Sequence, residues 1–191
     1  MGKQGSFIKR LTDLLFSLTT LIITFPILVV VALAIKIESK GPIFFIHKRT
    51  GFKGIPFKMI KFRGMVNNAL EIGPELTQKD DPRITRVGRF LRRTSIDEIP
   101  QVLNVLKGEM SIVGPRPEII SITQKYTDKQ KLIFNYKPGI TGFSQIHGRQ
   151  LLTPEERIEM ELDYYSKAGF WSNLFVALKT IGVIITNKGN L

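Results

Sequence analysis

The chain has 191 residues and no cysteine, and its 28 Lys and Arg residues outnumber its 16 Asp and Glu residues, giving a formal net charge of +12. This length suits one compact domain, or a domain plus a membrane attachment. The lack of cysteine excludes a disulfide framework and cysteine-based metal or redox sites, and two histidines argue against a histidine-rich zinc site. The charge predicts an anionic partner: nucleic acid, an acidic membrane surface or a phosphorylated ligand.

Residues 14–35 form an apolar segment without a single charge. At about 1.5 Å per residue, a straight helix of this length would cross a hydrocarbon core of about 30 Å. The segment is too long for a simple signal peptide, and no small-residue cleavage site follows it. Proline is tolerated in membrane-spanning helices, so one interpretation is an ordinary transmembrane helix with a kink at Pro26.

The charges around this segment favour a second interpretation. Basic residues flank both of its ends: Lys3, Lys9, Arg10, Lys36 and Lys40. Because basic flanks prefer the cytoplasmic side, both ends are satisfied only if the helix enters the membrane and returns on the same side. Pro26 removes a backbone donor near the middle and so provides a bend. We therefore predict a re-entrant, one-leaflet helix, in which Thr20 and Thr24 could satisfy carbonyls freed by the bend.

The next segment is basic and carries strand signals. Residues 43–46 and 57–62 are short apolar stretches around a glycine-containing turn, which is typical of a β-hairpin. Its cationic side chains are Lys48, Arg49, Lys53, Lys58, Lys61 and Arg63. Since the hairpin follows the membrane segment directly, we expect most of these side chains to face solvent or lipid headgroups. Residues 67–82 are polar and predict a loop with a short helix.

A basic amphipathic stretch at residues 83–93 precedes the acidic pair described next. Its arginines recur at near-helical intervals, and Ile84, Val87 and Leu91 form an apolar side. Basic patches also bind nucleic acid, but the chain has no recognised nucleic-acid motif and no array of stacking aromatic residues. We therefore predict no nucleic-acid partner.

Two adjacent carboxylates, Asp97 and Glu98, follow these arginines. Ser95 and Glu98 have the spacing of a capping box, and a helical apolar pattern continues from there to a stop at Lys107-Gly108. This predicts a helix that begins within a residue or two of Asp97. Its dipole and the nearby guanidinium groups would keep both carboxylates ionised. Acidic residues are also common in first helical turns, so the pair alone does not identify an active site.

A rigid loop is predicted around Arg116. Pro115 and Pro117 restrict the backbone on either side of this arginine. Such a loop suits bidentate recognition of a phosphate, although a Gly-Pro sequence alone is more typical of a structural turn.

The rest of the chain predicts helices separated by a glycine-rich segment. We expect helices over residues 119–136, 154–165 and 170–186, and a loop at residues 137–149 whose polar groups could surround a ligand. Lys179 lies near the centre of the last, apolar stretch. A lysine at mid-bilayer is costly, so this stretch predicts an interfacial or core helix and not a membrane span.

In combination, these stretches resemble the monotopic bacterial phosphoglycosyl transferases, the catalytic unit of undecaprenyl-phosphate sugar-phosphate transferases. The resemblance covers roughly residues 9–181, and the common order of many motifs makes it specific. The matching motifs are Lys9-Arg10-x-x-Asp13, Gly41-Pro42-Ile43-Phe44-Phe45, Lys61-Phe62-Arg63, Asp81-Pro82-Arg83-Ile84-Thr85, Ser95-Ile96-Asp97-Glu98-Ile99-Pro100-Gln101, Asn104-Val105-Leu106-Lys107-Gly108-Glu109-Met110-Ser111, Val113-Gly114-Pro115-Arg116-Pro117 and Pro138-Gly139-Ile140-Thr141-Gly142.

The resemblance implies transfer of a phosphosugar from a UDP-sugar to undecaprenyl phosphate, with release of UMP, as the first membrane step of surface glycan or glycoprotein assembly. It implies Mg²⁺ and a covalent aspartyl-phosphosugar intermediate, with Asp97 as the nucleophile and Glu98 as the residue that helps hold the metal. Candidate partners for the substrate phosphates are Lys61, Arg92, Arg116 and Arg149.

The implied fold is α+β and mainly helical, at the cytoplasmic face of the bacterial inner membrane and in contact with its phospholipids. Residues 1–40 would form the re-entrant helical hairpin. Residues 41–191 would form the catalytic domain, with a small β-hairpin and interfacial amphipathic helices. We expect the minimal catalytic form, without the further N-terminal spans of longer relatives.

The chain departs from the family pattern at three places. Phe25 stands where a serine usually precedes the proline, Gly64 replaces a usual threonine, and residues 143–147 replace a common Trp-Ala-Gln-Val-Asn. The last two leave the sugar and nucleotide preference open. The alternative function is a non-catalytic membrane protein that binds polyprenyl phosphate or nucleotide sugars, and such a protein would tolerate the loss of Asp97.

Overall fold

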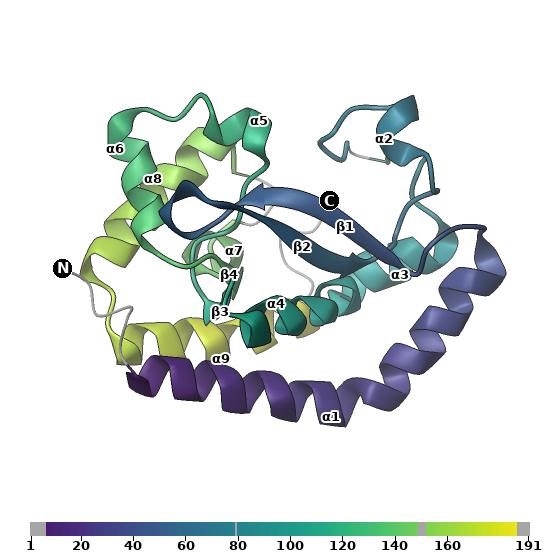
Figure 1. Cartoon of the computed structure of the whole chain (residues 1–191), viewed down its shortest axis with the longest axis horizontal. Coiled ribbons are helices and arrows are strands. Elements are labelled where there is room, and N and C mark those ends of the chain that lie inside the picture. The colour runs from purple at the N-terminus through teal and green to yellow at the C-terminus, as the bar shows by residue number, and fades with distance from the viewer. Residues whose placement is uncertain (1–6, 79, 149–151, 187–191) are drawn as a thin grey trace.

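The computed structural model describes residues 7–78, 80–148 and 152–186. This part of the chain is mainly helical, with two small sheets (Figure 1). The long helix α1 (Phe7–Glu38) runs along one side of the molecule, and the antiparallel hairpin of β1 (Phe44–Thr50) and β2 (Pro56–Phe62) crosses its middle. The prediction of a mainly helical α+β fold with a small β-hairpin is confirmed.

Helix α1 is continuous and curved, with Pro26 inside it (Figure 1). By length and composition it is the one helix in the described part of the chain that could cross a membrane. The Thr24 hydroxyl donates a hydrogen bond to the Thr20 carbonyl at 2.7 Å, a backward bond that often bends helices. The carbonyl that Pro26 leaves without its helical donor is that of Ile22, so this bond does not fill the role predicted for Thr24.

The first turns of α1 are tied to the folded body by polar contacts. Arg10 donates to the carbonyls of Val105 (2.6 Å) and Leu106 (3.0 Å), near the end of α4 (Val102–Lys107). Asp13 accepts hydrogen bonds from the Ser111 hydroxyl at 2.8 Å and the Ile112 amide at 3.0 Å. These two residues belong to β3 (Ser111–Val113), so α4 and β3 fix the beginning of the long helix.

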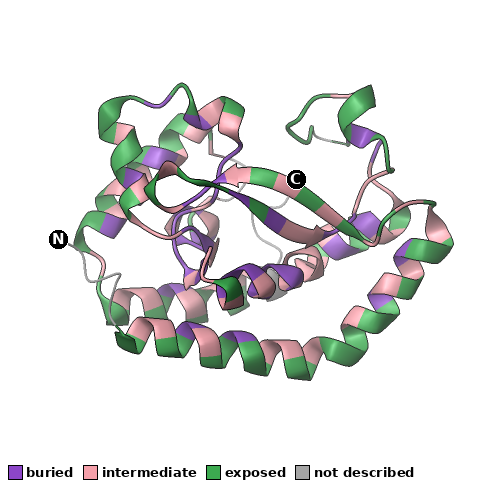
Figure 2. Ribbon diagram, in the orientation of Figure 1, coloured by how far each residue is buried: buried purple, intermediate pink, exposed green. Residues whose placement is uncertain are grey.

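The other end of α1 is tied to the same body. The carboxylate of Glu38 accepts from the amides of Arg86 (2.7 Å) and Val87 (3.0 Å), the first residues of α3 (Arg86–Thr94). Arg63, which follows β2, donates to the carbonyls of Lys40 and Ser39 at 2.6 and 2.8 Å. Between these two attachments the helix exposes large apolar side chains, and Figure 2 shows its largely exposed outer surface.

The hairpin is joined to α4 through a buried asparagine. Asn104 Oδ1 accepts from the Ile60 amide at 3.0 Å, and its Nδ2 donates to the Lys58 carbonyl at 2.7 Å. A side-chain amide that pairs with both backbone groups of a strand fixes that strand in register against the helix. This contact places β2, and with it Lys61, beside the turn that carries the carboxylates.

The predicted capping box is wrong. Ser95 has a left-handed backbone (φ 57°) and ends α3, with no side-chain capping hydrogen bond to the next helix. The acidic pair lies in a 3₁₀ helix, η2 (Ile96–Gln101), and α4 begins only at Val102. The left-handed backbone of Ser95 reverses the chain direction, so a tight turn separates the basic helix α3 from the two carboxylates in η2.

The second half of the chain differs partly from expectation. Residues 119–136 form short pieces instead of one helix: α5 (Ile120–Thr123), α6 (Asp128–Lys131) and the 3₁₀ helix η3 (Leu132–Asn135). A capping box at Thr127, which starts α6, accounts for one of these breaks. The strand β4 (Gly139–Thr141) pairs in parallel with β3, a pairing that the sequence pattern did not reveal.

Three further helices are close to prediction: α2 (Ala69–Ile72), α8 (Pro154–Lys167) and α9 (Phe170–Thr186), with a 3₁₀ turn η1 (Phe52–Gly54) in the hairpin. The short helix α7 (Phe143–Ile146) lies within residues 137–149, where the sequence predicted a loop. Helix α9 lies above the first half of α1 in Figure 1, and both helices pack on β3.

Candidate active site

The acidic pair lies within a group of cationic side chains from three separate elements. Lys61 Nζ of β2 is 2.7 Å from Glu98 Oε1, and an Arg116 guanidinium nitrogen is 4.0 Å from the same oxygen. Glu98 is half-buried, and the Arg116 side chain is 35% exposed. The fold therefore assembles Lys61, Glu98 and Arg116, which are far apart in sequence, into one solvent-accessible cluster.

Asp97 is half-buried in this cluster, and its pKa is raised to about 6. Loss of hydration is the largest cause and the negative charge of Glu98 adds to it, whereas Lys61 and Arg92 act in the opposite direction. The sequence predicted that this group would simply stay ionised. A carboxyl group with this pKa is still mostly ionised at neutral pH, so the prediction of an ionised group is not contradicted. The upward direction of the shift was not expected, and it arises because burial removes more hydration than the cations compensate.

Arg92 approaches the pair from α3. One guanidinium nitrogen donates to Thr77 Oγ1 at 3.1 Å, and among neighbouring charges that of Asp97 acts most strongly on the arginine. Burial lowers the pKa of Arg92, and Asp97 opposes this effect. Arg149, the fourth predicted phosphate partner, lies outside the described residues. Pro26 lies within the long apolar helix α1.

Arg49 is a candidate site residue that the sequence prediction missed. Burial lowers its pKa to about 10, and Arg116, Glu118 and Glu98 are among the charges that act on it. Its Nε is buried without a hydrogen-bond partner. A cation held near Arg116 with an unused donor is suited to an anionic ligand. The sequence feature that could have identified Arg49 is the alternation of side chains along β1, which places Arg49 on the opposite face of the strand from the exposed Lys48.

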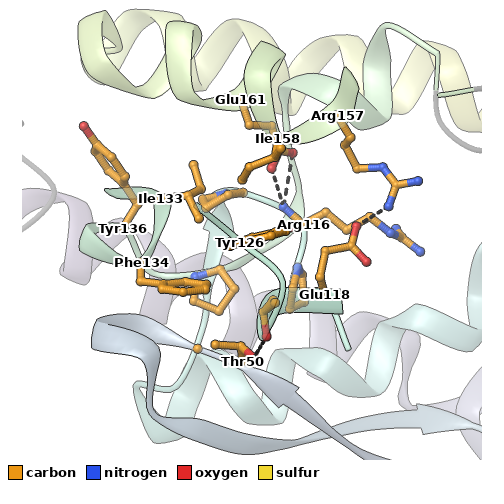
Figure 3. Close-up of a pocket in the computed structure, with 15 residues that line it drawn as sticks. Thr50, Arg116, Glu118, Tyr126, Ile133, Phe134, Tyr136, Arg157, Ile158 and Glu161 are labelled. Carbon is orange, nitrogen blue, oxygen red and sulfur yellow. Dashed lines mark hydrogen bonds and ion pairs between the residues drawn. The ribbon is translucent and has the colours of Figure 1, made fainter. Parts of the chain in front are cut away.

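The backbone of the loop that carries Arg116 is hydrogen-bonded to a buried carboxyl group (Figure 3). Both oxygens of Glu161, on α8, accept from the Arg116 backbone amide at 3.1 Å, and the Ser144 hydroxyl donates to Oε1 at 2.6 Å. Glu161 is 2% exposed, and burial raises its pKa to about 7. Sequence analysis did not single out Glu161 because its partners are backbone and hydroxyl groups from distant segments.

The space in front of Glu161 is too small for a substrate. The cavity lined by this loop, the end of β1 and α8 has a volume of about 20 Å³, which is room for about one water molecule. Figure 3 shows Glu118 pointing to Arg157 on α8, with which it forms an ion pair. These groups form a scaffold for Arg116, whose guanidinium lies on the side of Glu98.

The carboxylates fit a hard divalent cation that shares its coordination with a ligand. No group of three or more Asp, Glu, His or Cys side chains suitable for a metal occurs within residues 7–78, 80–148 and 152–186. Mg²⁺ commonly binds through one or two carboxylates together with substrate phosphates, without a cage made by the protein alone. Asp97 and Glu98 supply such a donor set, and the raised pKa of Asp97 marks a carboxyl group that further positive charge would stabilise in its ionised form.

Comparison with known proteins gives a family match over nearly the whole chain. The family model described as bacterial sugar transferase matches residues 4–187. A protein of Bacillus subtilis (strain 168), described as the uncharacterized sugar transferase EpsL, is 37% identical over 182 residues, which cover 95% of this chain and 89% of that protein.

Two longer relatives carry more specific names. The UDP-glucose:undecaprenyl-phosphate glucose-1-phosphate transferase of Escherichia coli (strain K12) is 40% identical, over 95% of this chain and 41% of that protein. The UDP-N-acetylgalactosamine-undecaprenyl-phosphate N-acetylgalactosaminephosphotransferase of Aeromonas hydrophila is 37% identical, over 96% of this chain and 45% of its own length. The chain therefore spans less than half of these two proteins.

Proposed function

Because the chain belongs to the bacterial sugar transferase family, we propose that it transfers a phosphosugar from a UDP-sugar to undecaprenyl phosphate. The products are UMP and undecaprenyl-diphosphate-sugar, at the first membrane step of surface glycan or glycoprotein assembly. The observation that carries the proposal is the acidic pair Asp97–Glu98 beside Lys61 and Arg116. Acids alone would repel a diphosphate, and the adjacent cations offset that repulsion.

The transfer proceeds in two balanced steps, with Asp97 as the nucleophile. In the first, a carboxylate oxygen of Asp97 forms a bond to the phosphorus that bears the sugar, and the bond from that phosphorus to the UMP oxygen breaks, so the electron pair leaves with UMP. In the second, a phosphate oxygen of the lipid attacks the same phosphorus and releases the carboxylate. Covalent catalysis lets a soluble donor and a membrane-bound acceptor use one carboxylate in turn.

The cationic side chains of the site act on the phosphates. Lys61 and Arg116 lie close enough to Glu98 to hold the donor diphosphate next to Asp97, and Arg92 adds positive charge near Asp97. Glu98, with Asp97 beside it, would hold Mg²⁺, which when bound neutralises charge on the substrate phosphates. Removal of divalent cations by a chelator should therefore stop UMP release, and added Mg²⁺ should restore it.

The membrane helix α1 is proposed to be re-entrant, with residues 1–40 as the membrane unit and residues 41–191 as the catalytic unit. Support comes from the attachments at its two ends: Arg10 and Asp13 bind α4 and β3, and Glu38 binds α3. A straight helix of 32 residues would be about 48 Å long. A helix that crossed the bilayer would separate these attachments by the hydrocarbon core, yet they lie on one folded body, which we place at the cytoplasmic face of the inner membrane.

Topology can be tested with single cysteines, since the chain has none of its own. In intact cells, Ser6→Cys and Lys48→Cys lie on either side of α1 and should both resist a membrane-impermeant thiol reagent until the inner membrane is opened. Labelling of Ser6→Cys from the periplasm, with Lys48→Cys protected, would identify a transmembrane helix instead.

The reaction is tested by UMP release from the purified protein with Mg²⁺, undecaprenyl phosphate and a panel of UDP-sugars. A panel is needed because the names of the relatives contain different sugars, glucose in one and N-acetylgalactosamine in another. At least one UDP-sugar should release UMP in an acceptor-dependent reaction. Binding of donor and acceptor without UMP release from any sugar would identify the non-catalytic binding protein.

A further inference from the structure

A large groove lies between the first half of α1 and helix α9, with a volume of about 980 Å³. This volume lies near the upper end of the roughly 300–1,000 Å³ typical of ligand pockets. Both helices pack on β3, so the strand forms part of the floor between them. The two-step transfer does not account for this groove.

The walls of the groove are mostly apolar and come from one stripe of each helix. On α1 the lining residues lie on one helical stripe and include two charged side chains near its start: Ile8, Lys9, Thr12, Asp13, Phe16 and Thr20. On α9 the lining is mostly apolar, with two polar side chains among its members: Phe170, Asn173, Leu174, Ala177, Leu178, Thr180, Ile181 and Val183. The floor includes Ile112 and Ile140. Such walls suit a flexible hydrocarbon chain and offer little to a nucleotide or a sugar.

The groove also reaches the acidic pair, since Ser95, Glu98 and Ile99 line it. Glu98 is the residue that pairs with Lys61 and lies 4.0 Å from Arg116. An amphiphile with its hydrocarbon in the groove would therefore have its anionic head beside these cations. This continuity between an apolar channel and a phosphate-binding cluster is complementary to a lipid phosphate.

We propose that the groove binds the first isoprene units of the polyprenyl phosphate acceptor, with the rest of its chain in the bilayer. The acceptor's identity rests on the proposed function, but the site rests on the groove. The phosphate then lies beside Lys61 and Arg116, within reach of the phosphorus carried by Asp97. A phosphate monoester carries more negative charge than the phosphodiester of a phospholipid, so Lys61 and Arg116 beside the groove favour the acceptor over phosphatidylglycerol.

The experiment measures binding separately from turnover. Thr12→Phe fills the groove from α1, and Ala177→Phe fills it from α9. Gly182→Phe is the matched control on α9, because Gly182 is exposed and does not line the groove. Among the described residues, and apart from its own turn of helix, no atom lies within 4 Å of an added Cβ at this position. Binding of undecaprenyl phosphate, geranyl phosphate and phosphatidylglycerol to each purified protein is measured by native mass spectrometry in detergent.

We expect the wild-type protein to bind undecaprenyl phosphate more tightly than phosphatidylglycerol. Each groove variant should weaken binding of undecaprenyl phosphate and geranyl phosphate by about ten-fold or more, while Gly182→Phe stays near wild type. Melting temperatures close to that of the control would show that the groove variants fold. The two substitutions enter the groove from opposite walls, so they are separate tests of the same site.

Two results would overturn the assignment. In one, the groove variants bind undecaprenyl phosphate as the control does; in the other, phosphatidylglycerol binds the wild type equally and is lost equally from the variants, which makes the groove a general lipid site. UMP release in the same preparations tests the proposed function separately. Groove-dependent binding without UMP release from any UDP-sugar would contradict the transfer reaction and leave the isoprenoid site standing.

Discussion

Arg116 connects two carboxyl regions that the molecule holds in different ways. Its backbone amide is bound by Glu161, whose oxygens also accept from Ser144, and this region is sealed inside the protein. Its guanidinium faces Glu98 in the second region, where Asp97 is half-buried among long cationic side chains. Both Glu161 and Asp97 have raised pKa values, of about 7 and about 6.

The difference shows why a raised pKa alone does not identify a reactive group. Glu161 is surrounded by short, fixed donors of the backbone and a hydroxyl, which hold it in place and leave no room for a substrate. The partners of Asp97 and Glu98 are lysine and arginine side chains, which can exchange a carboxylate for a phosphate. We therefore assign scaffolding to the Glu161 region and chemistry to the Asp97 region.

The largest effect should come from the nucleophile. Asp97→Asn removes the attacking oxygen's charge while keeping the shape of the side chain, so UMP release should fall by at least about a thousand-fold. The measurement is UMP release with a productive UDP-sugar. Asp163→Asn is the matched control, because Asp163 is an exposed aspartate of α8 paired only with Lys167 in the described structure. Turnover near wild type in Asp97→Asn would remove the distinction between the two regions.

A smaller effect is expected from the side chain that faces the site. Arg116→Gln removes a preorganised cation from the donor phosphates and should lower kcat/KM for the UDP-sugar by about a hundred-fold. The unfolding free energy should change little, since Glu161 binds the backbone of this residue and not its side chain. Arg89→Gln, at an exposed arginine on α3, should leave kcat/KM near wild type. Equal losses in both variants would indicate a general effect of charge.

The scaffold variant should act mainly on stability. Glu161→Ala leaves the Arg116 amide and the Ser144 hydroxyl without their acceptor, and each buried unsatisfied group costs about 1–3 kcal/mol. We expect a loss of about 2 kcal/mol or more in the free energy of unfolding, measured in urea in one detergent. Glu161→Gln should recover most of it, because one amide oxygen can accept from both donors. A full loss of turnover in a well-folded Glu161→Gln variant would contradict the scaffolding role.

The smallest effect concerns pH. The folded-state pKa of Glu161 is about 7, above its ordinary value of 4.5, so the folded protein binds more protons than the unfolded chain between these values. The stability from this group is therefore fully present below about pH 4.5 and is lost as the pH rises through about 7. Burial is the main cause of the raised pKa and the charge of Glu118 adds to it, whereas Ser144, the Arg116 amide and Arg157 lower the pKa.

This contribution is isolated by comparing the wild type with Glu161→Gln. The stability difference between them should move in favour of the variant as the pH is raised from 5 to 8. Asp97 also has a raised pKa and adds a trend of the same sign, but it is present in both proteins and cancels in the difference. A difference that does not change with pH would place the Glu161 carboxyl in its ordinary titration range.

The sequence predicted the elements whose signals are local. The apolar segment at residues 14–35, the two apolar stretches around the glycine-containing turn and the helix expected from residue 154 all correspond to observed elements. The capping box predicted at Ser95 is wrong, because the same residue spacing is compatible with a turn in which Ser95 has a left-handed backbone. Packing of α3 against the hairpin, which is distant in sequence, favours that turn. At Gly88 an added Cβ would lie 1.9 Å from the Gly64 carbonyl oxygen, so this close approach of α3 depends on contacts distant in sequence.

The sequence predicted the site residues mainly where they lie in recognisable motifs. The matched stretches contain Lys61, Asp97, Glu98 and Arg116, and the structure brings these residues together. Arg92 was predicted outside those motifs and also lies near Asp97, whereas Arg149 lies outside the described residues. Glu161 and Arg49 were missed because their roles come from burial and from neighbours on other elements. A sequence pattern records spacing along one element, and neither residue belongs to a motif of that kind.

The most direct test of the central claim is the mass of the intact protein after incubation with Mg²⁺ and a productive UDP-sugar, without lipid acceptor. The account predicts an added mass equal to one phosphosugar, located on the peptide that contains Asp97, absent from Asp97→Asn, and removed when undecaprenyl phosphate is supplied. Acceptor-dependent UMP release by a wild-type protein that never gains this mass, or the same mass found in Asp97→Asn, would contradict it.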